Sequence, residues 1–127
     1  MIPNDYRYGL VRERLDAAIA SVRESVNGVS LGEGIAYLEA LECLNANNRY
    51  EAIIIDILTK SLSNPYIHIL DNANITVTNN LPYDFQTNSF INREEFRIYT
   101  PTSQITAILN QALNILFDYL SLRGFIV

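Results

Sequence analysis

Apolar side chains recur at spacings of three and four residues through the last quarter of the chain, which predicts a long helix over residues 101–123. A start signal precedes it, because the Thr100 hydroxyl can cap free N–H groups and Pro101 suits the first helical position. Gly124 is a typical stop signal. The predicted apolar stripe consists of Ile105, Ile108, Leu109, Ala112, Leu116, Tyr119 and Leu120.

Further apolar residues widen this stripe. Leu113, Ile115 and Phe117 lie outside it, so the pattern predicts a core helix that is contacted on more than one side. Asn114 and Asp118 interrupt the apolar sequence, and no run of about eighteen apolar residues exists, so we do not expect a membrane span. The apolar tail, residues 124–127, ends in Phe125, Ile126 and Val127 and needs a surface that covers it.

The first half of the chain has the same periodicity in shorter segments and predicts a helical part over residues 5–63. The first helix covers about residues 5–26. A capping box from Ser30 to Glu33 predicts a second helix that begins at Leu31, and Asn48 to Glu51 predicts the start of a third. The apolar face of the first helix consists of Tyr8, Val11, Leu15, Ala18, Ile19, Val22 and Val26.

After Asn64-Pro65 the period changes to two, which is typical of strands. We expect a β part over residues 66–100, with strands at 66–70, 75–78 and 95–99 and a long loop over 79–92. The predicted fold is α+β, a single domain over residues 1–127. It has three N-terminal helices, a small antiparallel sheet of about three strands and a long C-terminal helix.

Composition and charge narrow the possible functions. The net charge of −5 disfavours nucleic acid as a direct partner, because phosphate binding needs clustered Lys and Arg. The N-terminus lacks a basic segment followed by an apolar one, so we expect cytoplasmic synthesis without secretion. A single cysteine excludes an internal disulfide.

The sequence contains no recognisable catalytic, phosphate-binding or metal-binding motif, and we expect no enzyme activity, cofactor or metal. His68 is the only histidine, and a lone histidine cannot build a usual zinc site. Cys43 lies next to leucines in an amphipathic segment, where a small buried side chain is expected. A pocket that brought these two residues together would favour a small enzyme instead.

Aromatic and arginine side chains indicate a protein interface, because tyrosine and arginine are enriched at interface centres. The candidate interface residues are Tyr83, Phe85 and Phe90 in the loop, Arg7 and Arg14 on the first helix, and Phe125, Ile126 and Val127 in the tail. These aromatic residues could equally hold the loop against the core of the domain.

Two functional hypotheses follow. The first is an oligomeric structural or interaction subunit of a larger protein assembly, for example a phage or viral virion component such as a head–tail connection or tail-completion protein. The alternative is a small acidic inhibitor or immunity-type protein that blocks a basic target. The alternative requires a clustered acidic patch, for which the candidates are Glu33, Glu39, Glu42 and Asp56.

Overall fold

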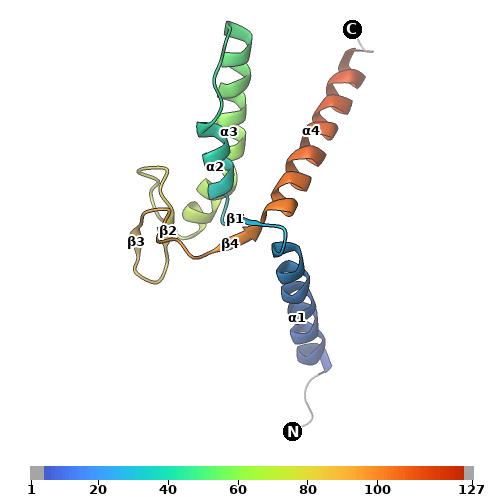
Figure 1. The fold of residues 1–127 in the computed structure, drawn as a ribbon, viewed down its shortest axis with the longest axis vertical. Helices are drawn as coiled ribbons and strands as arrows, with labels where there is room; N and C mark the ends of the chain where they lie inside the picture. The colour runs from blue at the N-terminus through green and yellow to red at the C-terminus, as the bar shows by residue number, and fades with distance from the viewer. Residues whose placement is uncertain (1–4, 125–127) are drawn as a thin grey trace. The chain divides into compact units, whose positions relative to one another are not determined.

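The computed structural model describes residues 5–124 and confirms the α+β class, with helices predominant (Figure 1). Three helices come first and one long helix comes last. Within residues 5–124, four short strands form two two-stranded sheets, β1 with β4 and β2 with β3. In chain order the elements are α1 (Asp5–Ser25), β1 (Val29–Leu31), α2 (Ile35–Glu42), α3 (Arg49–Asn72), β2 (Tyr83–Asp84), β3 (Ser89–Phe90), β4 (Tyr99–Pro101) and α4 (Thr102–Gly124). The candidate tail residues Phe125, Ile126 and Val127 lie outside the described residues.

The chain divides into two compact units. The terminal unit contains residues 1–29 and 100–127, and the central unit contains residues 30–99. The chain passes from one unit to the other twice, and β1 and β4 pair at these two crossings. Gly32 N–H donates to the Ile98 carbonyl at 2.9 Å and Thr102 N–H donates to the Gly28 carbonyl at 3.1 Å, so the two strands run in opposite directions. The single-domain organisation stays a prediction.

The core of the central unit lies where α2 packs on α3 and the following segments close over them. Half-buried apolar side chains from β1, α2 and the later segments surround it. This core is small, since few residues are fully shielded from solvent. Its buried members among the described residues are Ile35, Leu38, Tyr66, Leu70, Tyr83 and Phe96.

The predicted strand at residues 66–70 is wrong, because α3 continues through Pro65 to Asn72. Proline removes one backbone hydrogen bond from a helix interior, which made it a plausible break in the sequence. Tyr66 and Leu70 lie four residues apart on one helical face, with exposed fractions of 1% and 0%. Their burial in the core favours the continuous helix.

The predicted strand at residues 75–78 is also wrong. Asn74 adopts φ 57°, and the chain then turns so that Ile75 N–H donates to the Leu70 carbonyl at 2.9 Å. Ile75 and Val77 are half-buried against the core while their neighbours are exposed. The alternation in the sequence therefore reflects one covered side of an extended segment without strand pairing.

The helix starts were predicted unequally well. At α3 the capping prediction is confirmed, since Glu51 N–H donates to Asn48 Oδ1 at 2.9 Å and Asn47 N–H to Glu51 Oε2 at 2.7 Å. At α2 it is wrong: Leu31 belongs to β1, and the helix begins at Ile35. Its N-cap Gly34 has φ 84°, and a Cβ there would lie 3.1 Å from the Tyr66 nitrogen, so this turn requires glycine.

The remaining boundaries differ by a few residues. The region expected to be a loop contains the antiparallel hairpin β2–β3, in which Tyr83 pairs with Phe90 and Asp84 with Ser89. The strand predicted at 95–99 shares only Tyr99 with β4. α4 starts at Thr102 because Thr100 and Pro101 belong to β4.

Candidate interaction surface

α1 and α4 of the terminal unit meet through small and polar side chains. Ser103 Oγ donates to Glu24 Oε2 at 3.0 Å, which joins the C-terminal half of α1 to the first turn of α4. A shallow groove follows this junction, and small side chains allow the two helices to approach. Its lining residues are Ala17, Ala20, Ser21 and Glu24 from α1 and Pro101, Ser103, Gln104 and Ala107 from β4 and α4.

The apolar face of α1 points away from α4. Leu15 and Ile19 precede the groove residues Ala17 and Ser21 by two positions, which is about 200° around a helix. No residue of α1 is buried. We call this face the α1 stripe; its exposed members are Tyr8 (69%), Val11 (64%), Leu15 (58%), Ile19 (43%) and Val22 (70%).

The apolar face of α4 is turned away from α1 in the same manner. Ile105 and Leu109 follow the groove residues Ser103 and Ala107 by two positions, again about 200°. Between Thr102 and Leu122 only Ile105 and Leu109 are half-buried, and the other side chains are exposed. The prediction of a core helix contacted on several sides is therefore wrong. The α4 stripe consists of Ile105, Ile108, Leu109, Ala112, Leu116, Tyr119 and Leu120.

By length and composition, the segment from Thr102 to Leu122 is also sufficient to cross a membrane. One such helix is weak evidence, because the buried core helix of a soluble protein passes the same test, although none of this segment is buried here. Asn114 and Asp118 lie within this segment, and burying such groups in lipid without partners is costly. The absence of a membrane partner stays a prediction.

A third exposed apolar face lies on the first half of α3 in the central unit. Its members recur at helical spacing on a side that the buried Tyr66 and Leu70 do not share. They are Tyr50 (79% exposed), Ile53 (50%), Ile54 (54%) and Ile57 (57%). The fold therefore leaves this face of α3 uncovered.

The predicted aromatic interface residues separate into core and surface. Tyr83 is only 8% exposed and contacts the rings of Phe85 and Phe90 edge-on, each at a centroid distance of 5.1 Å. Phe90 is half-buried against the core, whereas Phe85 is 40% exposed. The hairpin aromatics thus hold β2–β3 to the central unit and leave one ring at the surface.

Arg7 and Arg14 are both exposed on α1. Two helical turns separate them, so they lie on one side of the helix next to the α1 stripe. Among the described candidate interface residues, the structure therefore brings Tyr83, Phe85 and Phe90 together in the central unit. Arg7 and Arg14 belong to the terminal unit.

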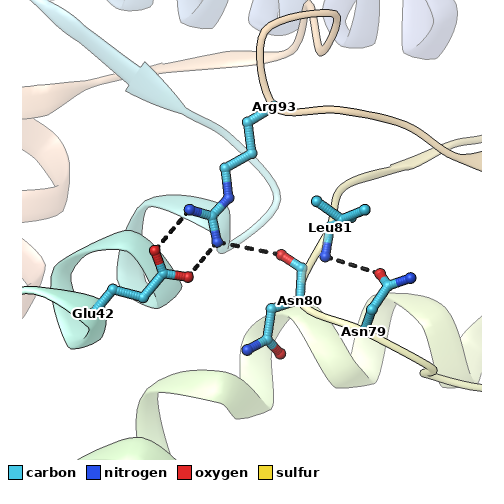
Figure 2. Close-up of polar contacts among 5 residues, drawn as sticks. All are labelled: Glu42, Asn79, Asn80, Leu81 and Arg93. Carbon is cyan, nitrogen blue, oxygen red and sulfur yellow. Dashed lines mark hydrogen bonds and ion pairs between the residues drawn. The ribbon is translucent and has the colours of Figure 1, made fainter.

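Arg93 is a structural residue that the sequence did not single out. Its guanidinium donates to Glu42 Oε2 at 2.8 Å and Oε1 at 2.5 Å, and Nη2 also reaches the Asn80 carbonyl at 3.5 Å (Figure 2). This hydrogen bonding and the positive charge of Arg93 lower the pKa of the Glu42 carboxyl. The pair joins α2 to segments about forty and fifty residues later, a contact that no local pattern indicates.

The four acidic candidates do not form a uniform free patch. Glu42 is paired with Arg93, and Asp56 is paired with Lys60 at 2.7 Å. Glu39 is near enough to Arg93 to raise the pKa of its guanidinium. Cationic partners within the chain therefore offset part of the negative charge that an inhibitor would present to a basic target.

Glu33, the fourth of them, is half-buried in the turn before α2. Its φ is 54°, and Oε2 is shielded from solvent without a hydrogen-bond partner. Burial raises the pKa of this carboxyl. Burial and the nearby charge of Glu33 together raise the pKa of Tyr66 to about 12, and the Tyr66 hydroxyl donates to the Leu81 carbonyl at 2.6 Å.

His68 and Cys43 are both exposed, on α3 and at the end of α2. The expectation that Cys43 is buried is wrong, because the short α2 ends before it. Within residues 5–124, no group of three His, Cys, Asp or Glu side chains could hold a metal ion. The described chain instead presents exposed apolar side chains along α1 and α4.

No protein-family model matches the sequence, and neither the curated proteins nor the solved structures contain a match.

Proposed function

We propose that the protein is a non-enzymatic structural or interaction subunit of a larger protein assembly. The supporting observation is the exposure of two apolar stripes in one unit, on α1 and on α4. Monomeric proteins in water rarely expose contiguous apolar patches larger than a few hundred Å². A protein partner on these stripes would remove that surface from water.

The lengths of the two helices support the same proposal. α1 has 21 residues and α4 has 23, yet no residue of α1 is buried. Most helical stability in proteins comes from packing of the apolar face, and propensity alone leaves a helix marginal. Gly9 lowers the helix propensity of α1 further. Helices of this kind gain their missing packing from a neighbouring subunit.

The more specific setting stays a prediction. A phage or viral head–tail connection or tail-completion protein works as one of several adjoining subunits, and two apolar stripes per copy would suit that arrangement. The acidic-inhibitor alternative has less support, because Glu42 and Asp56 already have cationic partners in the same chain.

The mass of the purified wild-type protein in solution tests the proposal. Light scattering after size exclusion, repeated over a hundredfold range of concentration, should give species at multiples of the 14.4 kDa chain. The larger species should gain population as concentration rises. A strict monomer throughout this range that also forms no complex with a second protein would contradict the proposal.

A further inference from the structure

We infer that the occupant of the α4 stripe is the α1 stripe of a second copy of this chain, so that copies join head to tail. The inference rests on the proposed function and specifies its partner. It uses only the terminal unit, where both stripes and the groove between α1 and α4 are described.

The first argument is direction. Most of each stripe lies on the side of its helix that is turned away from the side chains by which α1 and α4 meet, and only Ile108, one turn after the groove residue Gln104, lies at the groove edge. The greater part of neither stripe can therefore cover the other within one copy. A single neighbour that covered both stripes would have to reach two opposite sides of the unit. Two neighbours, one on each side, cover both without such wrapping.

The second argument is size. From Tyr8 to Val22 the α1 stripe is about 21 Å long, and from Ile105 to Leu120 the α4 stripe is about 22 Å long. Their exposed apolar side chains together present on the order of 1,000 Å². One head-to-tail contact buries one stripe on each partner, on the order of 1,000 Å² in total, which is about the minimum for a specific interface and smaller than the standard total of about 1,600 Å².

The third argument is charge. Between Thr102 and Leu122, Asp118 is the one side chain that is charged at neutral pH, and it follows Asn114 by one helical turn on the polar side of α4. α1 carries four basic and four acidic residues, which balance. Contact between the two stripes therefore creates no strong electrostatic repulsion between the two helices.

The symmetry that results is distinctive. An interface between two different patches of the same chain generates a closed ring if the rotation closes, and a filament if it does not. We expect the wild-type assembly to contain three or more copies. A wild-type dimer would overturn the head-to-tail arrangement and leave the proposed function intact.

Complementation between two variants tests the pairing directly. Leu15→Arg places a charge in the α1 stripe, and Leu116→Arg places one in the α4 stripe. Each variant alone should lose every species above 14.4 kDa, because an unpaired charge in an apolar contact is costly. An equal mixture should form a complex of twice that mass and no larger one, since each copy retains one intact stripe.

Matched controls place the same charge on the opposite sides of the two helices. Gly9→Arg on α1 and Asn114→Arg on α4 should keep the wild-type mass, since both positions are exposed, lie outside the stripes and are about two turns from the groove residues Ala17 and Ala107. Circular dichroism of all four variants checks folding, and recovery on mixing shows that each single variant remains competent to bind.

Other outcomes point to other occupants. A dimer of Leu15→Arg alone, or of Leu116→Arg alone, would mean that one stripe pairs with itself, and would overturn the inference. A wild-type oligomer unaffected by either variant would overturn it while the proposed function stands. Wild-type protein that is monomeric in water and binds phosphatidylcholine vesicles through α4 would make lipid the occupant, which contradicts it too.

Discussion

At the scale of single residues, Glu33 has a buried carboxylate oxygen without a partner, in a turn that glycine completes. Its φ of 54° is followed by φ 84° at Gly34, and the turn lies against Pro65 and Tyr66. Burial raises the pKa of Glu33 because the charged form loses hydration. An ionised Glu33 therefore lowers the stability of the folded chain at neutral pH.

The sign of this effect predicts a pH dependence for Glu33→Gln. Below the ordinary glutamate pKa of 4.5, both folded and unfolded chains carry a neutral Glu33, so the variant should match the wild type. As the pH rises through the folded pKa, only the wild type acquires a buried charge. The variant should then have the higher unfolding free energy at pH 7, measured by urea denaturation.

The control Glu95→Gln removes one exposed carboxylate from the same unit and tests for a general effect of net charge. A lower stability of Glu33→Gln than of wild type at pH 7 would mean that the carboxylate makes a favourable contact. Comparing both variants at pH 4 and pH 7 separates these cases.

At the scale of elements, side-chain hydrogen bonds to the backbone stabilise α3 at its start and in the turns before Pro65. Asn48 caps the helix through Glu51 N–H, and the Glu51 side chain returns to Asn47 N–H. Thr59, Ser61 and Ser63 donate to carbonyls four residues earlier, in the turns just before Pro65. Such bonds are found where helices bend, and they accompany the proline that interrupts the backbone ladder.

Asn48→Ala should lower the unfolding free energy by about 1 kcal/mol, because the first turn of α3 loses its side-chain cap. Thermal or urea denaturation measures the change. Asn48→Asp, which keeps an acceptor at the same position, should retain most of the wild-type stability. Equal losses in the two variants would show that Asn48 acts through another contact.

At the scale of the whole molecule, burial is distributed unevenly between the two units. The central unit has a small core. In the terminal unit, the side chains of α1 and those of α4 as far as Leu122 are mostly exposed. Both arginines that the sequence proposed for an interface, Arg7 and Arg14, lie in the terminal unit. Contact between copies through the apolar stripes and contact through ion pairs respond differently to salt, so the salt dependence of the assembly distinguishes them.

We expect the wild-type assembly to persist, or to gain population, when NaCl rises from about 0.1 M to about 1 M. Salt screens repulsion between copies that each carry a net charge of −5, and it leaves apolar contacts in place. Sedimentation velocity at the two concentrations measures the populations. Dissociation at high salt would show instead that ion pairs, for example from Arg7 or Arg14, hold the copies together.

The sequence by itself determined features that depend on neighbouring residues. These are the α+β class, the approximate extents of α1 and α4 and the cap of α3. Local sterics, helix capping and a period of 3.6 residues depend only on residues close in sequence, so they can be predicted without knowledge of the rest of the chain. The strands predicted at 66–70 and 75–78 are wrong. A proline can lie inside a helix as well as end it, and a period of two occurs in any extended segment with one covered side.

Only the tertiary structure decided what covers each face. Tyr66 and Leu70 are buried because α2 and Phe96 pack against them. Arg93 pairs with Glu42, which precedes it by fifty-one residues in the sequence. The α1 stripe is left exposed and the α4 stripe is partly covered only at Ile105 and Leu109, although the patterns of both helices match those of buried helices. Periodicity specifies which side chains share a face, but burial requires a second surface, and that surface comes from distant parts of the chain or from another molecule.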